Sequence, residues 1–94
     1  PDSCEQNGHI FYLKTQSAEI RDQLLAYLKQ NKVHAVFHYL PLHNTEMGKQ
    51  HGEFIGNDQH TLETSRLIVR LPLYFSLQDA EVKHITKTIE SFYA

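Results

Sequence analysis

The sequence predicts a small α+β domain in two layers, with a two- or three-stranded sheet covered by three helices. Segments rich in β-branched and aromatic residues alternate along the chain with amphipathic helical segments. A chain of 94 residues, 40% of them hydrophobic, can bury one modest core without disulfides or metals. We therefore expect one domain over residues 9–94, preceded by a polar leader or linker over residues 1–8.

The first part of this domain is predicted to form a strand, a helix and a second strand. Residues 9–14 lack clean alternation of polar and apolar side chains, which is typical of a central strand or one covered on both faces. Ser17 is the expected N-cap of a helix over residues 18–30, and Asn31 is its expected stop. The apolar residues at helical spacing in this helix are Ile20, Leu24, Tyr27 and Leu28. The second strand is expected over residues 33–37.

A long polar stretch follows the second strand. Residues 44–58 hold three of the four glycines and show no core stripe, so we expect a loop that is functional or docks against something absent. Asp58 or Thr61 can cap the next helix, over residues 62–69. The inner face predicted for that helix is Leu62, Ser65, Ile68 and Val69.

The last third is predicted to form a short strand and a closing helix. Residues 70–74 contain Pro72, which confines any strand there to an edge or a break. Ser76 and Asp79 resemble a capping box, and the closing helix is expected over residues 77–93. Its apolar stripe is Val82, Ile85, Ile89 and Phe92.

Charge and composition exclude several classes of function. The net charge of −2 and the sequence pI of about 6.4 give no basic surface for nucleic acid, and no apolar run is long enough to cross a membrane. A single cysteine, Cys4, fits a reducing compartment, so we expect a cytoplasmic protein. The linker-like leader and a first residue other than Met favour a piece of a longer protein.

The most informative stretch is residues 38–43, His-Tyr-Leu-Pro-Leu-His, which we call the histidine segment. It carries two imidazoles and a phenol off the end of the second predicted strand, because Pro41 cannot continue a sheet ladder. Acid–base chemistry by His38 or His43 is possible, since imidazole titrates near neutrality. The alternative is that His38 and Tyr39 pack against the helices as satisfied core polar groups.

Other chemistries find less support. Five histidines lie in the middle third, but neither an HExxH nor a CxxC motif is present, so a histidine-rich metal binder is a weaker hypothesis. The glycines lead into no P-loop, and no GxSxG elbow is found. Arg66 and Arg70 lie near a predicted helix end; they can bind an anion, although solvated or paired arginines are commoner.

Several blocks together resemble a known family. They are residues 9–12 (His-Ile-Phe-Tyr), 35–43 (Ala-Val-Phe-His-Tyr-Leu-Pro-Leu-His), 52–54 (Gly-Glu-Phe) and 70–74 (Arg-Leu-Pro-Leu-Tyr), with helices between and after them. In order and spacing they resemble the C-terminal part of the DegT/StrS-type sugar aminotransferases, which are pyridoxal-phosphate enzymes of the aspartate-aminotransferase fold. The resemblance extends from about His9 to Tyr93.

The resemblance implies a fragment. In this family the Schiff-base lysine and the residues that hold the cofactor lie in a large N-terminal domain, and none of the six lysines here matches those motifs. The fragment would therefore contain no catalytic residue, bind no pyridoxal phosphate and be inactive alone. The full-length enzyme would bind pyridoxal phosphate, form a homodimer and transfer an amino group from an amino acid, with glutamate the expected donor, to a TDP-4-keto-6-deoxyhexose for cell-surface polysaccharide biosynthesis.

Site residues carried over by position are those of the histidine segment. His38 and His43 match the two histidines of the family's His-aromatic-x-x-x-His block near the nucleotide-sugar pocket. The resemblance thus implies that His43, His38 and Tyr39 contact substrate and form one wall of the pocket. The alternative function is a stand-alone ligand- or protein-binding α+β module of ferredoxin-like layout, with the middle loop as its binding surface.

Overall fold

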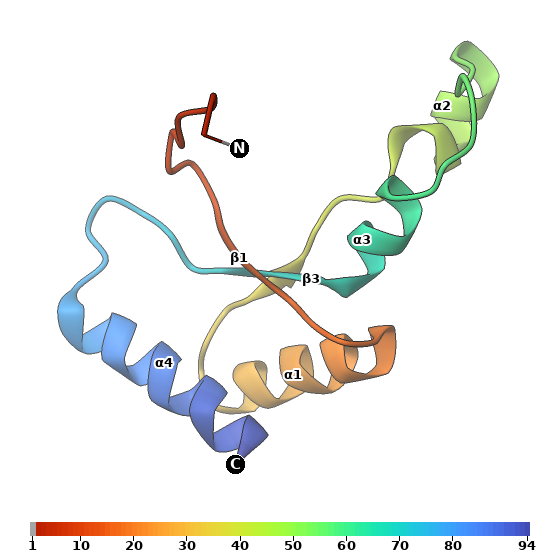
Figure 1. The fold of residues 1–94 in the computed structure, drawn as a ribbon. Coiled ribbons are helices and arrows are strands. Elements are labelled where there is room, and N and C mark those ends of the chain that lie inside the picture. Colours follow the sequence, from red (N-terminus) through yellow and green to blue (C-terminus); the bar gives the residue numbers. More distant parts are fainter. Residues whose placement is uncertain (1) are drawn as a thin grey trace.

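The structure, a computed structural model, describes residues 2–94 and shows the predicted two-layer α+β architecture (Figure 1). Pro1, the first residue of the predicted leader, lies outside the described residues. The strands are β1 (Phe11–Lys14), β2 (Val36–Phe37) and β3 (Ile68–Leu71), and the helices are α1 (Ala18–Gln30), α2 (Glu46–His51), α3 (Thr61–Leu67) and α4 (Asp79–Tyr93). A 3₁₀ turn, η1 (Leu42–Asn44), precedes α2. Among the described residues, no helix is long and apolar enough to span a bilayer.

The sheet has β3 in its middle, between β1 and β2, and both neighbours run antiparallel to it. Strands β1 and β2 are therefore parallel to each other and connected through α1, so that β3 splits a β-α-β unit. The strand predicted over residues 70–74 lies at residues 68–71 and in the middle of the sheet, so its bounds and the edge position were wrong, whereas the break at Pro72 is confirmed. Pro72 follows directly after the central strand and ends it, which is compatible with its missing N–H group.

Strand β1 lies at an edge of the sheet, which corrects the prediction of a central or doubly covered strand. Phe11 and Tyr12 are 60% and 49% exposed. Their aromatic character raises the β-propensity of the segment, but it does not decide which strand takes the centre. That position is decided by the pairing of β3 with both neighbours.

Strand β2 is shorter than the predicted strand over residues 33–37. The N–H group of Val33 donates to the carbonyl of Leu28 over 2.8 Å, and that of Ala35 donates to the carbonyl of Val33 over 3.1 Å. Residues 33–35 are therefore bonded to the end of α1 and to one another rather than to β3. Val33 still contributes to the core, since it is only 3% exposed.

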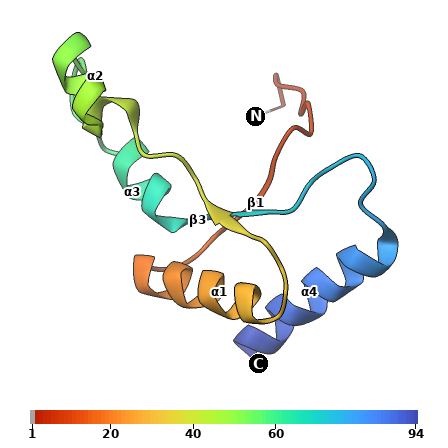
Figure 2. The same ribbon diagram turned by 180° about the vertical axis from the view of Figure 1, so that it is seen from behind.

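The core lies between the sheet and the two long helices. Leu24, Leu28 and Val69 are fully buried, and the α4 residues Ile85, Ile89 and Phe92 pack against them. Figures 1 and 2 show α1 and α4 on the same side of the strands, and this arrangement leaves the opposite face of the sheet uncovered. The apolar stripe predicted for the first helix is confirmed at its two buried leucines.

The caps of the long helices are partly as predicted. Ser17 caps α1, because its Oγ accepts the N–H of Ile20 over 3.2 Å, and Asn31 ends the helix by donating to the carbonyl of Tyr27 over 2.9 Å. Helix α4 begins later than predicted. The N–H of Gln78 donates to the Glu81 carboxylate over 2.8 Å, so the capping box is displaced by two residues from the predicted Ser76 and Asp79.

The long middle stretch, predicted as a loop, contains helix α2. Thr45 caps this helix by accepting the N–H of Gly48 over 3.0 Å. Gly48 is also required sterically, because a Cβ at this position would overlap the carbonyl oxygen of Leu42. Helix α2 projects from one end of the sheet, far from α1 and α4, whereas α3 lies between α2 and the sheet and contacts α1 (Figure 2). We call residues 42–58 the α2 lobe.

Candidate functional site

The histidine segment leaves β2 and passes along α3. His38 and the buried Pro41 line one side of a cleft of about 320 Å³, and Thr61, Thr64 and Ser65 of α3 line the other. The cleft is therefore lined by one imidazole and by four hydroxyl-bearing residues, Tyr39 among them, although the Ser65 hydroxyl already donates to the carbonyl of Leu62 over 2.7 Å. Side chains of this kind suit hydrogen bonding to a hydroxyl-rich or anionic small molecule.

The His38 ring has an unusual environment. Its Nδ1 atom is buried, and no hydrogen-bond partner for it exists among the described residues. Buried polar atoms are rarely left without a partner, so this nitrogen needs a partner that the described side chains do not supply. The hypothesis that His38 and Tyr39 are satisfied core polar groups is wrong, since Tyr39 is also 74% exposed.

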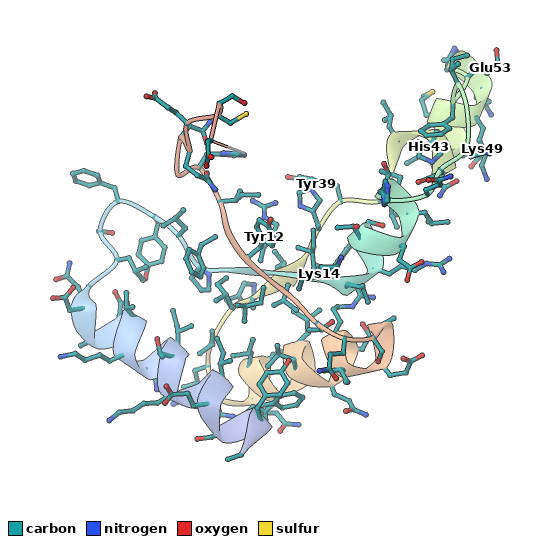
Figure 3. The ribbon with its side chains drawn as sticks, viewed as in Figure 1. Tyr12, Lys14, Tyr39, His43, Lys49 and Glu53 are labelled. Carbon is teal, nitrogen blue, oxygen red and sulfur yellow. The ribbon has the colours of Figure 1, made fainter. Side chains whose placement is uncertain are left out.

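Tyr39 lies next to His38 and against the sheet. The centroids of the two rings are 5.6 Å apart, and the guanidinium carbon of Arg70 lies 5.5 Å from the Tyr39 ring centroid. Figure 3 shows Tyr39 and Tyr12 on the side of the strands that α1 and α4 do not cover. An aromatic ring within about 6 Å of a guanidinium group attracts and orients it.

His43 belongs to a second cluster, in the α2 lobe (Figure 3). Its Nε2 lies 2.6 Å from the Oδ2 atom of Asp58, and its ring centroid lies 4.2 Å from that of Phe54. Asp58 also accepts the N–H of Leu62 over 3.1 Å through its other oxygen, so one carboxylate fixes both the imidazole and the start of α3. Asp58 was expected only as a cap; its role as the partner of His43 was missed, because fifteen residues separate the two.

The electrostatics of this cluster favour the ionised carboxylate. Desolvation acts to raise the pKa of Asp58, but hydrogen bonds from the Leu62 backbone and the His43 side chain, with the charge of His43 and the Thr61 backbone, outweigh it and lower the pKa. The side chains of His43 and Asp58 are only 21% and 16% exposed. The pair therefore holds the imidazole through Nε2 and leaves Nδ1 for another partner.

The structure brings two of the three predicted site residues together. His38 and Tyr39 share the cleft beside α3, whereas His43 lies with Asp58 in the α2 lobe. Substrate contact by His43, His38 and Tyr39 stays a prediction. Arg70 was noted in the sequence only as one of two arginines near a helix end, and its position over Tyr39 depends on sheet register that no local pattern reveals.

The described side chains were tested for their ability to hold a metal ion or pyridoxal phosphate. Among residues 2–94, no three His, Cys, Asp or Glu side chains gather as a metal ion would require. All six lysines are exposed: Lys14, Lys29, Lys32, Lys49, Lys83 and Lys87. A Schiff-base lysine is activated in a desolvated pocket, so the described residues do not fit a covalently held pyridoxal phosphate.

Fold and site together define a small α+β domain that presents a strand end bearing imidazole and phenol groups to a cleft. Sequence comparison adds the family. The profile of the DegT/DnrJ/EryC1/StrS aminotransferase family matches residues 2–90, and the chain belongs to this family. The resemblance of the four sequence blocks is thereby confirmed at the level of the family.

A curated relative gives the scale of the match. A protein of Geobacillus stearothermophilus named "Pleiotropic regulatory protein" is 26% identical over 94 residues, which are 99% of this chain and 25% of the relative. The chain thus spans about a quarter of the length of that relative.

Proposed function

We propose that this chain is the C-terminal small domain of a nucleotide-sugar aminotransferase and forms one wall of its substrate pocket. The family match supports an aminotransferase, and members of this family use pyridoxal phosphate. The observation that carries the proposal is the cleft beside α3, which His38 and Tyr39 of the histidine segment line together with hydroxyl-bearing residues of α3. In this proposal the cofactor is held by residues outside the chain, in keeping with the six exposed lysines.

The proposed substrate is a TDP-4-keto-6-deoxyhexose, as for TDP-4-oxo-6-deoxy-D-glucose transaminase, with glutamate as amino donor. His38 hydrogen-bonds to the sugar or diphosphate through its imidazole ring, and Tyr39 lies beside it. His43, oriented by Asp58, offers its second ring nitrogen to the same substrate once the α2 lobe is in place over the pocket. Each residue binds and orients; none is proposed as the base of the reaction.

The proposed assembly is a cytoplasmic homodimer of the complete protein, in which the isolated 94-residue chain is inactive. The two-layer fold leaves one sheet face and several large apolar side chains exposed, which supports packing against further parts of the protein. Exposed apolar residues in the α2 lobe include Leu42 at 78% and Ile55 at 83%.

The test uses the complete protein that contains this chain, loaded with pyridoxal phosphate. We expect amino transfer from glutamate to TDP-4-keto-6-deoxyglucose, measured by formation of 2-oxoglutarate. His38→Ala and His43→Ala should each raise the KM for the sugar nucleotide about tenfold or more, the loss of one hydrogen bond to a charged or polar group. His51→Ala, an exposed histidine at the end of α2, is the matched control and should behave as wild type.

Two results would contradict the proposal. One is a complete protein without amino transfer to any 4-keto nucleotide sugar. The other is unchanged KM and kcat in both histidine variants, which would remove the histidine segment from the substrate pocket. The split β-α-β sheet also occurs in ferredoxin-like domains, which favours the stand-alone binding module as the second candidate. Specific ligand or protein binding by the isolated chain, without amino transfer by any longer protein, would support that candidate instead.

A further inference from the structure

We propose that Arg70 is an oxyanion-binding residue on the sheet face that α1 and α4 do not cover, and that the Tyr39 ring orients its guanidinium group. The ligand group is a phosphate or a carboxylate of a small molecule, which guanidinium groups bind through two parallel hydrogen bonds. The inference rests on the proposed function only in assuming that this anion belongs to a substrate. It adds to the histidine segment a residue from the central strand, 27 positions beyond His43 in the sequence.

Sheet register determines where Arg70 points. In β3 it pairs with Tyr12 of β1 and Val36 of β2, which lie 49% and 44% exposed on the same face. Its neighbour Val69 points to the opposite face and is fully buried under α1 and α4. The guanidinium group therefore leaves the sheet from the middle of the uncovered face, between two uncharged neighbours.

The charge on this face is positive although the chain as a whole is negative. The side chains that share it by strand alternation are Tyr12, Lys14, Val36, Ile68 and Arg70. Two of the five are cationic and none is acidic, in a chain of net charge −2. Such a local excess attracts small anions.

Arg70 is also free of a carboxylate partner among the described residues. The two salt bridges found there join Arg21 to Asp22 over 2.6 Å and His43 to Asp58 over 2.6 Å. Arg70 is half-buried rather than fully solvated, so an ion pair formed here is less screened than one at a protruding surface arginine. Arg70 is therefore an unpaired, half-buried cation in the middle of the sheet, and an anion that binds there would supply its missing partner.

Tyr39 supplies the orientation. Its ring contacts the guanidinium group on one side, at 5.5 Å from the centroid, which leaves the other N–H donors for a ligand. Because Tyr39 adjoins His38, the same short segment connects Arg70 to the hydroxyl-lined cleft. A ligand with a sugar and a charged group can contact both. Tyr39 is thus a positioning residue for Arg70, in addition to the substrate contact proposed for Tyr39 itself.

The experiment measures binding to the complete protein by calorimetry, with inorganic pyrophosphate, TDP and glutarate as separate probes. Arg70→Gln should weaken at least one probe about 10- to 100-fold, the range for one charge-assisted bidentate contact. Arg70→Lys keeps the positive charge but cannot form two parallel hydrogen bonds, so it should lose less probe affinity than Arg70→Gln. Lys83→Gln removes one positive charge from the exposed surface of α4, in the layer on the other face of the sheet, and is the matched control. Tyr39→Leu should weaken the same probe as Arg70→Gln, by about two- to fivefold.

The probes distinguish the source of the anion. A loss confined to pyrophosphate and TDP identifies the diphosphate of the nucleotide sugar, and a loss confined to glutarate identifies the carboxylate of the amino donor; either supports the inference. It is overturned if wild type binds none of the three at millimolar concentration, or if Arg70→Gln binds all three within twofold of wild type. It is also overturned if Lys83→Gln loses as much probe affinity as Arg70→Gln. Thermal unfolding of each variant verifies that the fold is kept.

Failure of this inference and failure of the proposed function give different results. If wild type transfers no amino group but its probe binding depends on Arg70, the proposed aminotransferase is wrong and the anion site stands. If wild type transfers amino groups and Arg70→Gln is unaffected in probe binding and in KM, the proposed aminotransferase stands and the anion site at Arg70 is wrong.

Discussion

The two faces of the sheet should respond very differently to the same substitution. Val69 and Val36 both lie in strands, but Val69 is fully buried on the helix-covered face and Val36 is 44% exposed on the other. Val69→Ala removes two methyl groups from the core, worth about 0.8 kcal/mol each by transfer. An unrelaxed cavity of about 50 Å³ adds roughly 1 kcal/mol at about 24 cal/mol per Å³. We therefore expect a loss of roughly 2–3 kcal/mol in the free energy of unfolding.

Val36→Ala is the control, and it should cost less than about 1 kcal/mol, since no cavity forms and part of the side chain already meets water. The measurement is urea unfolding of the 94-residue chain followed by far-UV circular dichroism, with equal m-values taken as evidence that only stability changed. In thermal unfolding, Val69→Ala should lower Tm by about 10–20 °C, from about 4–8 °C per kcal/mol for a domain of this size. Equal losses for both valines, or a loss below about 1 kcal/mol for Val69→Ala, would refute the assignment of the two faces. The orientation of Arg70 would then lose its basis.

Three further predictions concern single local features. Asp58 has a lowered pKa in the folded state, so its stabilising effect is complete above the unfolded value of about 3.9 and is lost as the pH falls through the lower folded value. The protection factor of the Leu62 amide, which corrects for the pH dependence of intrinsic exchange, should fall over this acid range in wild type and not in Asp58→Asn; the same fall in both proteins would contradict the assignment. Ser17→Ala removes the α1 cap and should cost about 1 kcal/mol in urea unfolding, whereas Ser3→Ala, in the exposed leader, should cost nothing measurable. Gly48→Ala should disrupt the packing of α2 on η1, seen as lost amide protection in the α2 lobe with the core amides unchanged, and protection equal to wild type would count against the overlap with Leu42.

Local patterns were sufficient for the two long helices and for the fold class. Leu24 and Leu28 recur one turn apart, and both are fully buried in α1. Ser17 and Asn31 bound this helix with hydrogen bonds that depend only on neighbours three or four residues away. Such signals are contained in the sequence because partner and partnered residue lie within one helical turn.

Strand positions required information that no local pattern contains. Ile68 and Val69 fit the apolar face of a helix and an apolar strand equally well, so α3 was extended over residues that belong to β3. Pairing with β1 and β2 decided the outcome, and both partners are more than thirty residues earlier in the chain. Helix α2 was missed for a different reason. It has six residues and none is buried, so it has a cap at Thr45 but no apolar stripe.

The residues of the candidate site also divide into those that local sequence reveals and those that only tertiary structure reveals. The histidine segment was found because its residues are contiguous, whereas Asp58 and Arg70 join it only through tertiary structure. Asp58 and Arg70 also differ in their expected roles, because they lie on different elements of the fold. Asp58 binds the imidazole of His43 and the first turn of α3 at once, so substituting it removes the link between them. Arg70 lies on the central strand next to the buried Val69, and its guanidinium group lies over the Tyr39 ring on the face that α1 and α4 do not cover. Under the proposed function, we therefore predict that Arg70→Gln raises the KM for the sugar nucleotide with kcat unchanged, whereas Asp58→Asn changes both KM and kcat in the aminotransferase assay of the complete protein.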